Sequence, residues 1–272
     1  MTGQQPATVY THGHQESVLR SHRSRTAADS AGYLVPELRP GQALLDVGCG
    51  PGTITADLAE LVGPTGRVVA VDTSAEVLEQ AAAYVAGRGL DNVVFEVADV
   101  HALHHADGEF DVVHAHQVLQ HVADPVAALR EMRRVTAEDG VVAARDVDYA
   151  TMTWYPQAPE LDRWLELYRR IARSNGGEPD AGRRLLSWAR AAGFTEVAAT
   201  SSTWTYATPE QRAWWGGLWA DRILDSAIAA TAVAEGFADR AELERISAGW
   251  REWAAADDGW FAMLHGEVLA RG

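Results

Sequence analysis

The segment LLDVGCGPGT, at residues 44–53, combines a buried strand pattern, a carboxylate and a glycine loop. Its apolar residues fit a strand that is covered on both faces. Gly48 and Gly50 have no Cβ atom, so a ligand can lie directly against the backbone there. Apolar residues at helical spacing follow the loop, which places the N-terminal amides of a helix beside the same ligand. The pattern predicts a nucleotide-type site on a strand–loop–helix unit.

The carboxylate of Asp46 indicates which nucleotide fits this site. The dinucleotide pattern G-x-G-x-x-G holds a pyrophosphate at a helix N-terminus, but Thr53 stands at the position of its third glycine. Asp46 lies two residues before the first glycine, where it would repel a pyrophosphate and attract a cation or an amine. S-adenosylmethionine carries a sulfonium and an ammonium group and no phosphate. It is therefore favoured over a nicotinamide dinucleotide.

Two further carboxylates follow predicted strands. A strand over residues 68–71 leads to Asp72, about 20 residues past the glycines, where an acid in such folds accepts hydrogen bonds from two ribose hydroxyls. Thr73 comes next and forms a capping-box pattern with Glu76 at the start of a helix. The strand predicted over 92–97 is followed by Asp99. Asp72 and Asp99 thus each follow a predicted strand, whereas Asp46 lies near the end of the first one.

In order and spacing, these motifs resemble those of the class I S-adenosylmethionine-dependent methyltransferases over roughly residues 40–150. The small-molecule type, similar to the enzymes of ubiquinone and menaquinone biosynthesis, is the nearest kind. The resemblance implies S-adenosylmethionine as cofactor, with Asp99 accepting from the exocyclic amine of adenine beside Val100. It also implies that the segment from Gln117 to Val122 follows strand four. The residues expected to bind the cofactor are Asp46, Gly48, Gly50, Asp72, Thr73, Asp99, Val100, His116 and Gln117.

Histidines gather where the methyl group should emerge. Methyl transfer from a sulfonium is an in-line displacement that needs an aligned nucleophile and sometimes a base. His114 and His116 share one face of the strand predicted over 110–116, and His121 follows it. In similar small-molecule O-methyltransferases a histidine in this segment is the base, so His121 is the expected catalytic base. Asp146, at the end of the strand over 141–146, could orient it or act alone.

The expected fold is an α/β, doubly wound, seven-stranded and mostly parallel sheet of the class I methyltransferase, Rossmann-like type. The last two strands are expected over 196–205 and 260–269. A helical lid comes from the N-terminus and from insertions after strands five and six. The expected organisation is a helical cap (1–39), the cofactor-binding core (40–150), an inserted lid helix (151–182), a core helix with strand six (183–207), a helical lid insertion (208–258) and the closing strand (259–272).

The N-terminal segment is expected to be helical over residues 15–38, with Thr26 and Asp29 as a cap in its middle. In many small-molecule methyltransferases such a helix closes over the cofactor. Tyr10, His14 and Arg25 could then reach the methionine carboxylate or the substrate. The alternative is that this cationic segment is a solvated helix face.

All ten tryptophans lie between Trp154 and Trp260, outside the cofactor half. Indole offers broad apolar contact, so a tryptophan-rich lid indicates a flat or apolar small-molecule substrate. Most of the tryptophans are expected to pack the extra helices, and a minority to line a pocket.

Composition limits the partners. The net charge of −15 would repel DNA and RNA, so no nucleic-acid partner is expected. A single cysteine excludes an internal disulfide and a zinc–thiolate cluster, and His101, His104 and His105 lack companion ligands, so no metal is expected. No apolar run reaches about 18 residues, and residues 1–15 lack a signal sequence, which predicts a cytoplasmic protein without a membrane partner. The oligomeric state stays open.

Three other functions remain possible on the sequence alone. An enzyme of the same fold could bind S-adenosylmethionine and catalyse a non-methyl reaction such as cyclisation. A nicotinamide dehydrogenase is disfavoured by Asp46 and Thr53. A regulatory protein could sense the cofactor without turnover. A mass gain of one methylene equivalent on a substrate would separate methyl transfer from all three.

Overall fold

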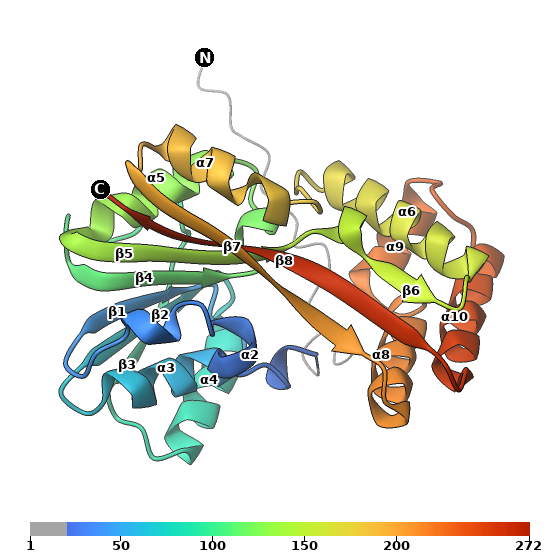
Figure 1. The fold of residues 1–272 in the computed structure, drawn as a ribbon, viewed down its shortest axis with the longest axis horizontal. Helices are drawn as coiled ribbons and strands as arrows, with labels where there is room; N and C mark the ends of the chain where they lie inside the picture. Colours follow the sequence, from blue (N-terminus) through green and yellow to red (C-terminus); the bar gives the residue numbers. More distant parts are fainter. Residues whose placement is uncertain (1–20) are drawn as a thin grey trace.

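The computed structural model describes residues 21–272 and contains one mixed sheet with helices on both faces (Figure 1). The strand order is β3-β2-β1-β4-β5-β8-β6, and β7 pairs with β8. The strands are β1 (Ala43–Val47), β2 (Arg67–Asp72), β3 (Val93–Val97), β4 (Phe110–His116), β5 (Thr136–Val147), β6 (Thr153–Tyr155), β7 (Glu196–Tyr206) and β8 (Trp260–Arg271). Strands β1 to β5 run parallel, and β8 is antiparallel to its neighbours.

Both faces of the parallel half are covered, which explains the continuous apolar strands. Helices α2 (Ala27–Ser30) and α3 (Thr53–Val62) pack on the face that presents Leu44. Helices α5 (Pro125–Val135) and α7 (Leu185–Ala192) pack on the face that presents Leu45. Helix α4 (Ala75–Gly87) lies beside α3 (Figure 1). The doubly wound, mostly parallel architecture expected from the sequence is confirmed.

The sheet has eight strands in the described residues, one more than expected. Strand β5 pairs with residues 265–270 of β8 and stops at Val147, which leaves the start of the long strand β8 unpaired on that side. The chain then makes a short 3₁₀ turn, η3 (Tyr149–Thr151), and returns as β6 opposite Trp260–Ala262. Three residues leave little sequence signal, but the unpaired backbone of β8 provides their partner.

The segment expected to be helical over 15–38, with a cap in its middle, is only partly helical in its described part. Residues 21–23 are helical, the chain then straightens, and α2 has four residues before the 3₁₀ turn η1 (Val35–Glu37). The predicted cap is present as a capping box, in which Thr26 accepts from Asp29 N. Thr26 has extended backbone angles, so it starts a new helix instead of continuing one. Tyr10 and His14 lie outside the described residues.

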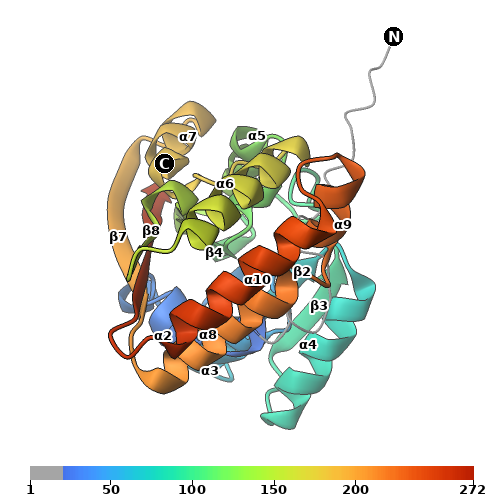
Figure 2. The same cartoon turned by 90° about the vertical axis from the view of Figure 1, so that its right-hand side faces the viewer.

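The two insertions form a single helical layer at the far end of β7 and β8 (Figures 1 and 2). It comprises α6 (Pro159–Ser174), α8 (Pro209–Arg222), α9 (Ala227–Ala234) and α10 (Arg240–Ala255). Their shared core is aromatic: the ring centroid of Trp164 lies 4.5 Å from that of Trp219 and 4.8 Å from that of Trp250. The tryptophans therefore join segments that are separated in sequence by a core helix and strand β7.

Candidate active site

The glycine loop after β1 has the positive backbone angles that glycine tolerates best. Gly48 has φ 66° and Gly50 has φ 54°. A Cβ atom at Gly48 would meet Cγ2 of Val118 at 2.5 Å, whereas one at Gly50 would have no atom within 4 Å. The sequence assigned both glycines to ligand approach. The structure gives Gly48 a packing reason and leaves open space only at Gly50.

Asp72 ties the end of β2 to this loop. Its Oδ2 accepts a hydrogen bond from Gly50 N at 3.2 Å, and its Oδ1 accepts from Ser74 N at 3.1 Å. Ser74, rather than Thr73, is the N-cap residue of α4, because its hydroxyl accepts from Val77 N. The capping role expected of Thr73 is therefore wrong, and Thr73 lies on the wall of the adjoining pocket.

Asp46 is almost fully buried, and both of its oxygens have partners. Oδ1 lies 2.8 Å from Nδ1 of His114, on the neighbouring strand, and Oδ2 accepts from the hydroxyl of Thr55 at 2.6 Å. His114 is thereby fixed as a partner of Asp46. The carboxylate nevertheless borders the pocket and supplies negative charge where the sequence expects a cationic ligand.

Asp99 and Val100 lie beyond the end of β3. Val100 is buried, while Asp99 accepts from the backbone N of His101 at 2.9 Å and lies 2.7 Å from its Nδ1. Burial raises the pKa of Asp99, but these hydrogen bonds with His101 outweigh it and lower the pKa overall. Asp99 is thus held as a carboxylate that can accept hydrogen bonds.

These groups surround one pocket of about 400 Å³ at the carboxyl ends of β1, β2 and β4. All nine expected cofactor-binding residues line it, as does His121. This edge is where ligands bind in open α/β sheets. The open space at Gly50 and the three acids fit a ligand with hydroxyl, amino and sulfonium groups. The nine residues that the sequence predicts to hold S-adenosylmethionine thus lie around one pocket, and their binding role stays a prediction.

His116 and Gln117 form the boundary of this pocket at the end of β4. Both ring nitrogens of His116 are buried without a hydrogen-bond partner among the described residues. Burial, and then the charges of Arg25 and Arg145, lower the pKa of His116 well below its usual value. Gln117 has φ 55° and accepts from Arg25 Nη2 at 2.9 Å, while its amide nitrogen donates to Nε2 of His265 at 3.1 Å. Gln117 thus links the N-terminal segment to β8.

His121 lines the same pocket from the 3₁₀ turn η2 (Leu119–His121). Its Nε2 lies 3.0 Å from the amide nitrogen of Gln120. Burial, and then the charge of Arg25, lower the pKa of His121 to about 3. The ring is therefore neutral near pH 7, with Nε2 accepting a hydrogen bond from the amide of Gln120, and its low pKa makes it a weaker base than an ordinary histidine.

Asp146 does not line either of the two pockets at this end of the sheet, so its catalytic role stays a prediction and the contacts of its side chain point to an indirect one. Side chains alternate along a strand, and Val147 faces the neighbouring pocket, so Asp146 points to the opposite face. There its Oδ1 accepts from Gln120 N at 3.1 Å. The carboxyl group thus holds the backbone of η2, the turn that carries His121. Any orienting effect on His121 acts through this backbone and not through direct contact.

Replacing Asp146 with asparagine is expected to stabilise the fold, increasingly with pH. Burial raises the pKa of Asp146 to about 8, against an ordinary value of about 4 in the unfolded chain. Between these values the folded state holds a proton that the unfolded state has lost. Wild-type stability therefore falls by about 1.4 kcal/mol for each unit that pH rises in this window, and the asparagine variant lacks this loss because its side chain does not titrate.

Urea unfolding at pH 5, 6.5 and 8 would measure the gain of Asp146→Asn over wild type. The exposed residue Asp91 offers a matched control, and Asp91→Asn should show no gain comparable to that of Asp146→Asn. A gain at Asp146 that stays constant from pH 5 to pH 8 would contradict the raised pKa.

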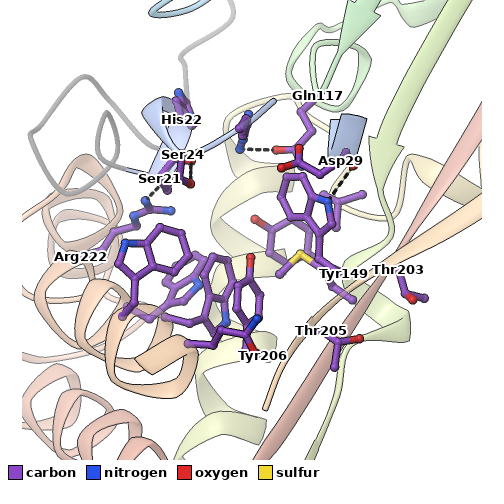
Figure 3. A pocket seen from close by; sticks show the side chains of 18 residues that line it. Ser21, His22, Ser24, Asp29, Gln117, Tyr149, Thr203, Thr205, Tyr206 and Arg222 are labelled. Carbon is purple, nitrogen blue, oxygen red and sulfur yellow. Dashed lines mark hydrogen bonds between the residues drawn. The ribbon is translucent and has the colours of Figure 1, made fainter. Parts of the chain in front are cut away.

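A second pocket of about 380 Å³ adjoins the first and has aromatic walls (Figure 3). The two pockets share His22, Arg25 and Gln117. Tyr206 stacks on Trp215 at a centroid distance of 4.4 Å, and Trp204 donates from its indole nitrogen to Asp29 O at 3.0 Å. The aromatic residues that line this second pocket are Tyr149, Trp204, Tyr206, Trp214, Trp215 and Trp219.

Several residues of the second pocket were not singled out from the sequence. They are Tyr149, Tyr206, Arg222 and Met263. Each belongs to a different element, and none forms a motif with its chain neighbours. The only sequence signal was the clustering of aromatic residues after strand five. It indicated which part of the chain is involved, but not which aromatic side chains line the pocket and which pack between the helices.

Two negative findings apply to the described residues. Among residues 21–272, no group of three or more histidine, cysteine, aspartate or glutamate side chains could hold a metal ion. Over the same range, no helix is long and apolar enough to cross a membrane.

Known proteins share this architecture and sequence. A family model for a methyltransferase domain matches residues 38–204. An uncharacterized methyltransferase of Schizosaccharomyces pombe is 32% identical over 268 residues, 96% of this chain and 95% of that protein. A demethylmenaquinone methyltransferase of Lactococcus lactis is 33% identical over 170 residues, 58% of this chain and 67% of that protein.

The same fold occurs in the YcgJ protein of Bacillus subtilis, whose crystal structure superposes with a TM-score of 0.57 at 19% identity, covering 88% of this chain and 97% of that one. The family match reaches past the core into strand β7, further than the motifs quoted from the sequence. This chain therefore belongs to the S-adenosylmethionine-dependent methyltransferases.

Proposed function

We propose that this enzyme transfers a methyl group from S-adenosylmethionine to a small aromatic metabolite bound in the second pocket. The observation that carries the proposal is the junction of the two pockets. Arg25 and Gln117 line both pockets and are hydrogen-bonded to each other at 2.9 Å, so a ligand in the aromatic pocket and one in the cofactor pocket would contact the same two side chains. A volume of about 380 Å³ with aromatic walls suits a ring system of one or two rings.

Rate enhancement in such a site comes mainly from alignment. The aromatic walls fix the plane of the acceptor ring, and the cofactor residues fix the donor, so the displacement starts from a near-attack geometry. His121 then takes the proton of a nucleophile that extends from the second pocket into the cofactor pocket, because His121 lines only the cofactor pocket and is neutral near pH 7. The bound S-adenosylmethionine supplies the methyl group. Asp146 acts only through the backbone of η2.

Labelled S-adenosylmethionine tests this proposal. Incubation of the enzyme with a metabolite extract and a donor carrying an isotopic methyl group is expected to label an aromatic compound, with a mass gain of one methylene equivalent. Cyclisation would change a substrate without incorporating the label, and a cofactor sensor would change none. Label found only on compounds without an aromatic ring would overturn the proposed substrate class.

A further inference from the structure

Arg222 places a buried positive charge in the wall of the second pocket but not of the cofactor pocket. The residue is 3% exposed. Its Nη2 donates to the hydroxyl of Ser21 at 2.9 Å, and its guanidinium carbon lies 4.8 Å from the ring centroid of Trp219. These contacts hold the guanidinium in place at the wall. A guanidinium in that position presents positive charge and N–H donors to an anionic group of a ligand that enters the pocket.

The pocket also offers hydrogen-bond donors beside Arg222. Burial raises the pKa of Tyr149 to about 12, and it raises the pKa of Tyr206 as well, so both hydroxyls keep their protons at neutral pH. Both tyrosines line the pocket, so their hydroxyls can donate to acceptor oxygens of a ligand.

Negative charge is scarce in the described part of this wall. Asp29 is the only carboxylate among the described lining residues, and it is exposed. Its Oδ1 accepts from Thr26 N at 3.1 Å and from the hydroxyl of Ser30 at 2.5 Å, so it is occupied at the start of α2. Arg25 adds a second positive charge at the junction with the cofactor pocket.

We propose that the methyl acceptor is an aromatic carboxylate and that Arg222 binds its carboxylate group. This inference rests on the proposed function and names the substrate class more closely. A guanidinium matches a planar carboxylate with two parallel hydrogen bonds. Arg222 and Gln117 lie on opposite sides of the pocket (Figure 3). The carboxylate therefore lies across the pocket from Gln117, and the reacting substituent points to Gln117, which also lines the cofactor pocket.

A matched pair of ligands tests the charge requirement directly. The probes are 6-hydroxy-2-naphthoate and its neutral amide, which carry the hydroxyl and the acid or amide group at opposite ends of the ring system. Calorimetry with S-adenosylhomocysteine present is expected to show the acid binding at least about tenfold more tightly than the amide. Arg222→Met should abolish this ratio, and Arg222→Lys should keep part of it.

The ratio of acid to amide affinity distinguishes recognition of the carboxylate by Arg222 from a purely structural role of this residue. A variant that only loosens the pocket would weaken acid and amide alike, and circular dichroism would report any loss of fold. Arg251→Met is the control. Arg251 is exposed, pairs with Asp221 at 2.8 Å and does not line the pocket, so this variant should keep the wild-type ratio of acid to amide affinity.

Two results would overturn the inference. One is a wild-type enzyme that binds acid and amide equally, or binds neither. The other is a folded Arg222→Met variant that keeps the wild-type ratio. The proposed function fails separately, if labelled S-adenosylmethionine transfers no methyl group to any aromatic compound. If only neutral aromatic compounds are labelled, the proposed function stands and the inference of a carboxylate substrate is wrong.

Discussion

Replacing His121 with alanine is expected to lower kcat by about 10²- to 10⁴-fold, the usual contribution of a positioned base. His121 lines the cofactor pocket on the turn that follows β4, and its ring is neutral near pH 7. It does not need to bind the cofactor to act, so affinity for S-adenosylmethionine should change little. Single-turnover rates at saturating substrate, together with cofactor calorimetry, would measure both quantities.

The pH profile gives this prediction a second readout. A base is lost when it is protonated, which happens below its pKa. The sequence alone predicts a fall in rate below the ordinary histidine pKa of about 6.5. Because burial and the charge of Arg25 lower the pKa of His121 to about 3, the rate should instead stay level between pH 8 and pH 5. A fall centred near 6.5 would indicate a different base.

Two further variants would help to identify the base if it is not His121. His104 is exposed and lies outside both pockets, so His104→Ala should keep the full rate. His116 also lines the cofactor pocket, and its ring lies 5.9 Å from that of Trp204 in the second pocket. Full activity in His121→Ala with loss in His116→Ala would move the role to His116. Full activity in both would leave alignment as the main source of rate.

Replacing Asp72 with alanine is expected to weaken S-adenosylmethionine binding by about 5- to 150-fold, equivalent to about 1–3 kcal/mol. The variant leaves the ribose hydroxyls without their acceptor. It also removes the hydrogen bonds that hold Gly50 N and Ser74 N, so the loop loses part of its order. Asp72→Asn keeps one acceptor oxygen, so its affinity for S-adenosylmethionine should lie between those of wild type and Asp72→Ala.

Calorimetric titration with S-adenosylmethionine would measure these affinities, and thermal unfolding would show whether the fold survives. Asp91→Ala removes an exposed acid from the same half of the chain and should bind normally. Wild-type affinity in a folded Asp72→Ala variant would remove Asp72 from the cofactor site. Gly48→Val cannot serve the same purpose, because its side chain would collide with Val118 before it reached a ligand.

The cofactor half could be read from the sequence because its signals are local. Glycines, strand-end acids and the helix that follows lie within a few residues of one another. Parallel strands then bring their carboxyl ends to one edge, and the register pairs Asp46 with Ala70 on one side and with His114 on the other. Regular pairing therefore carries each local motif into the same pocket without further information.

The substrate half could not be read in this way, because its residues meet only through packing. Trp204 and Tyr206 come from β7, Arg222 from α8 and Arg25 from the N-terminal segment. Asp146 shows the same limit within one strand. The sequence placed it correctly at the end of β5, but alternation allows either face to point at the substrate, and in the structure Val147 rather than Asp146 lines the second pocket.

The sequence by itself determined the fold class, the cofactor and the edge of the sheet where the chemistry occurs. These follow from backbone geometry that neighbouring residues fix. Only the tertiary structure decided which tryptophans form a wall, where β6 pairs and which charged groups reach the second pocket. Those outcomes depend on how far-separated segments pack, and side-chain packing has no signature in the spacing of residues along one segment.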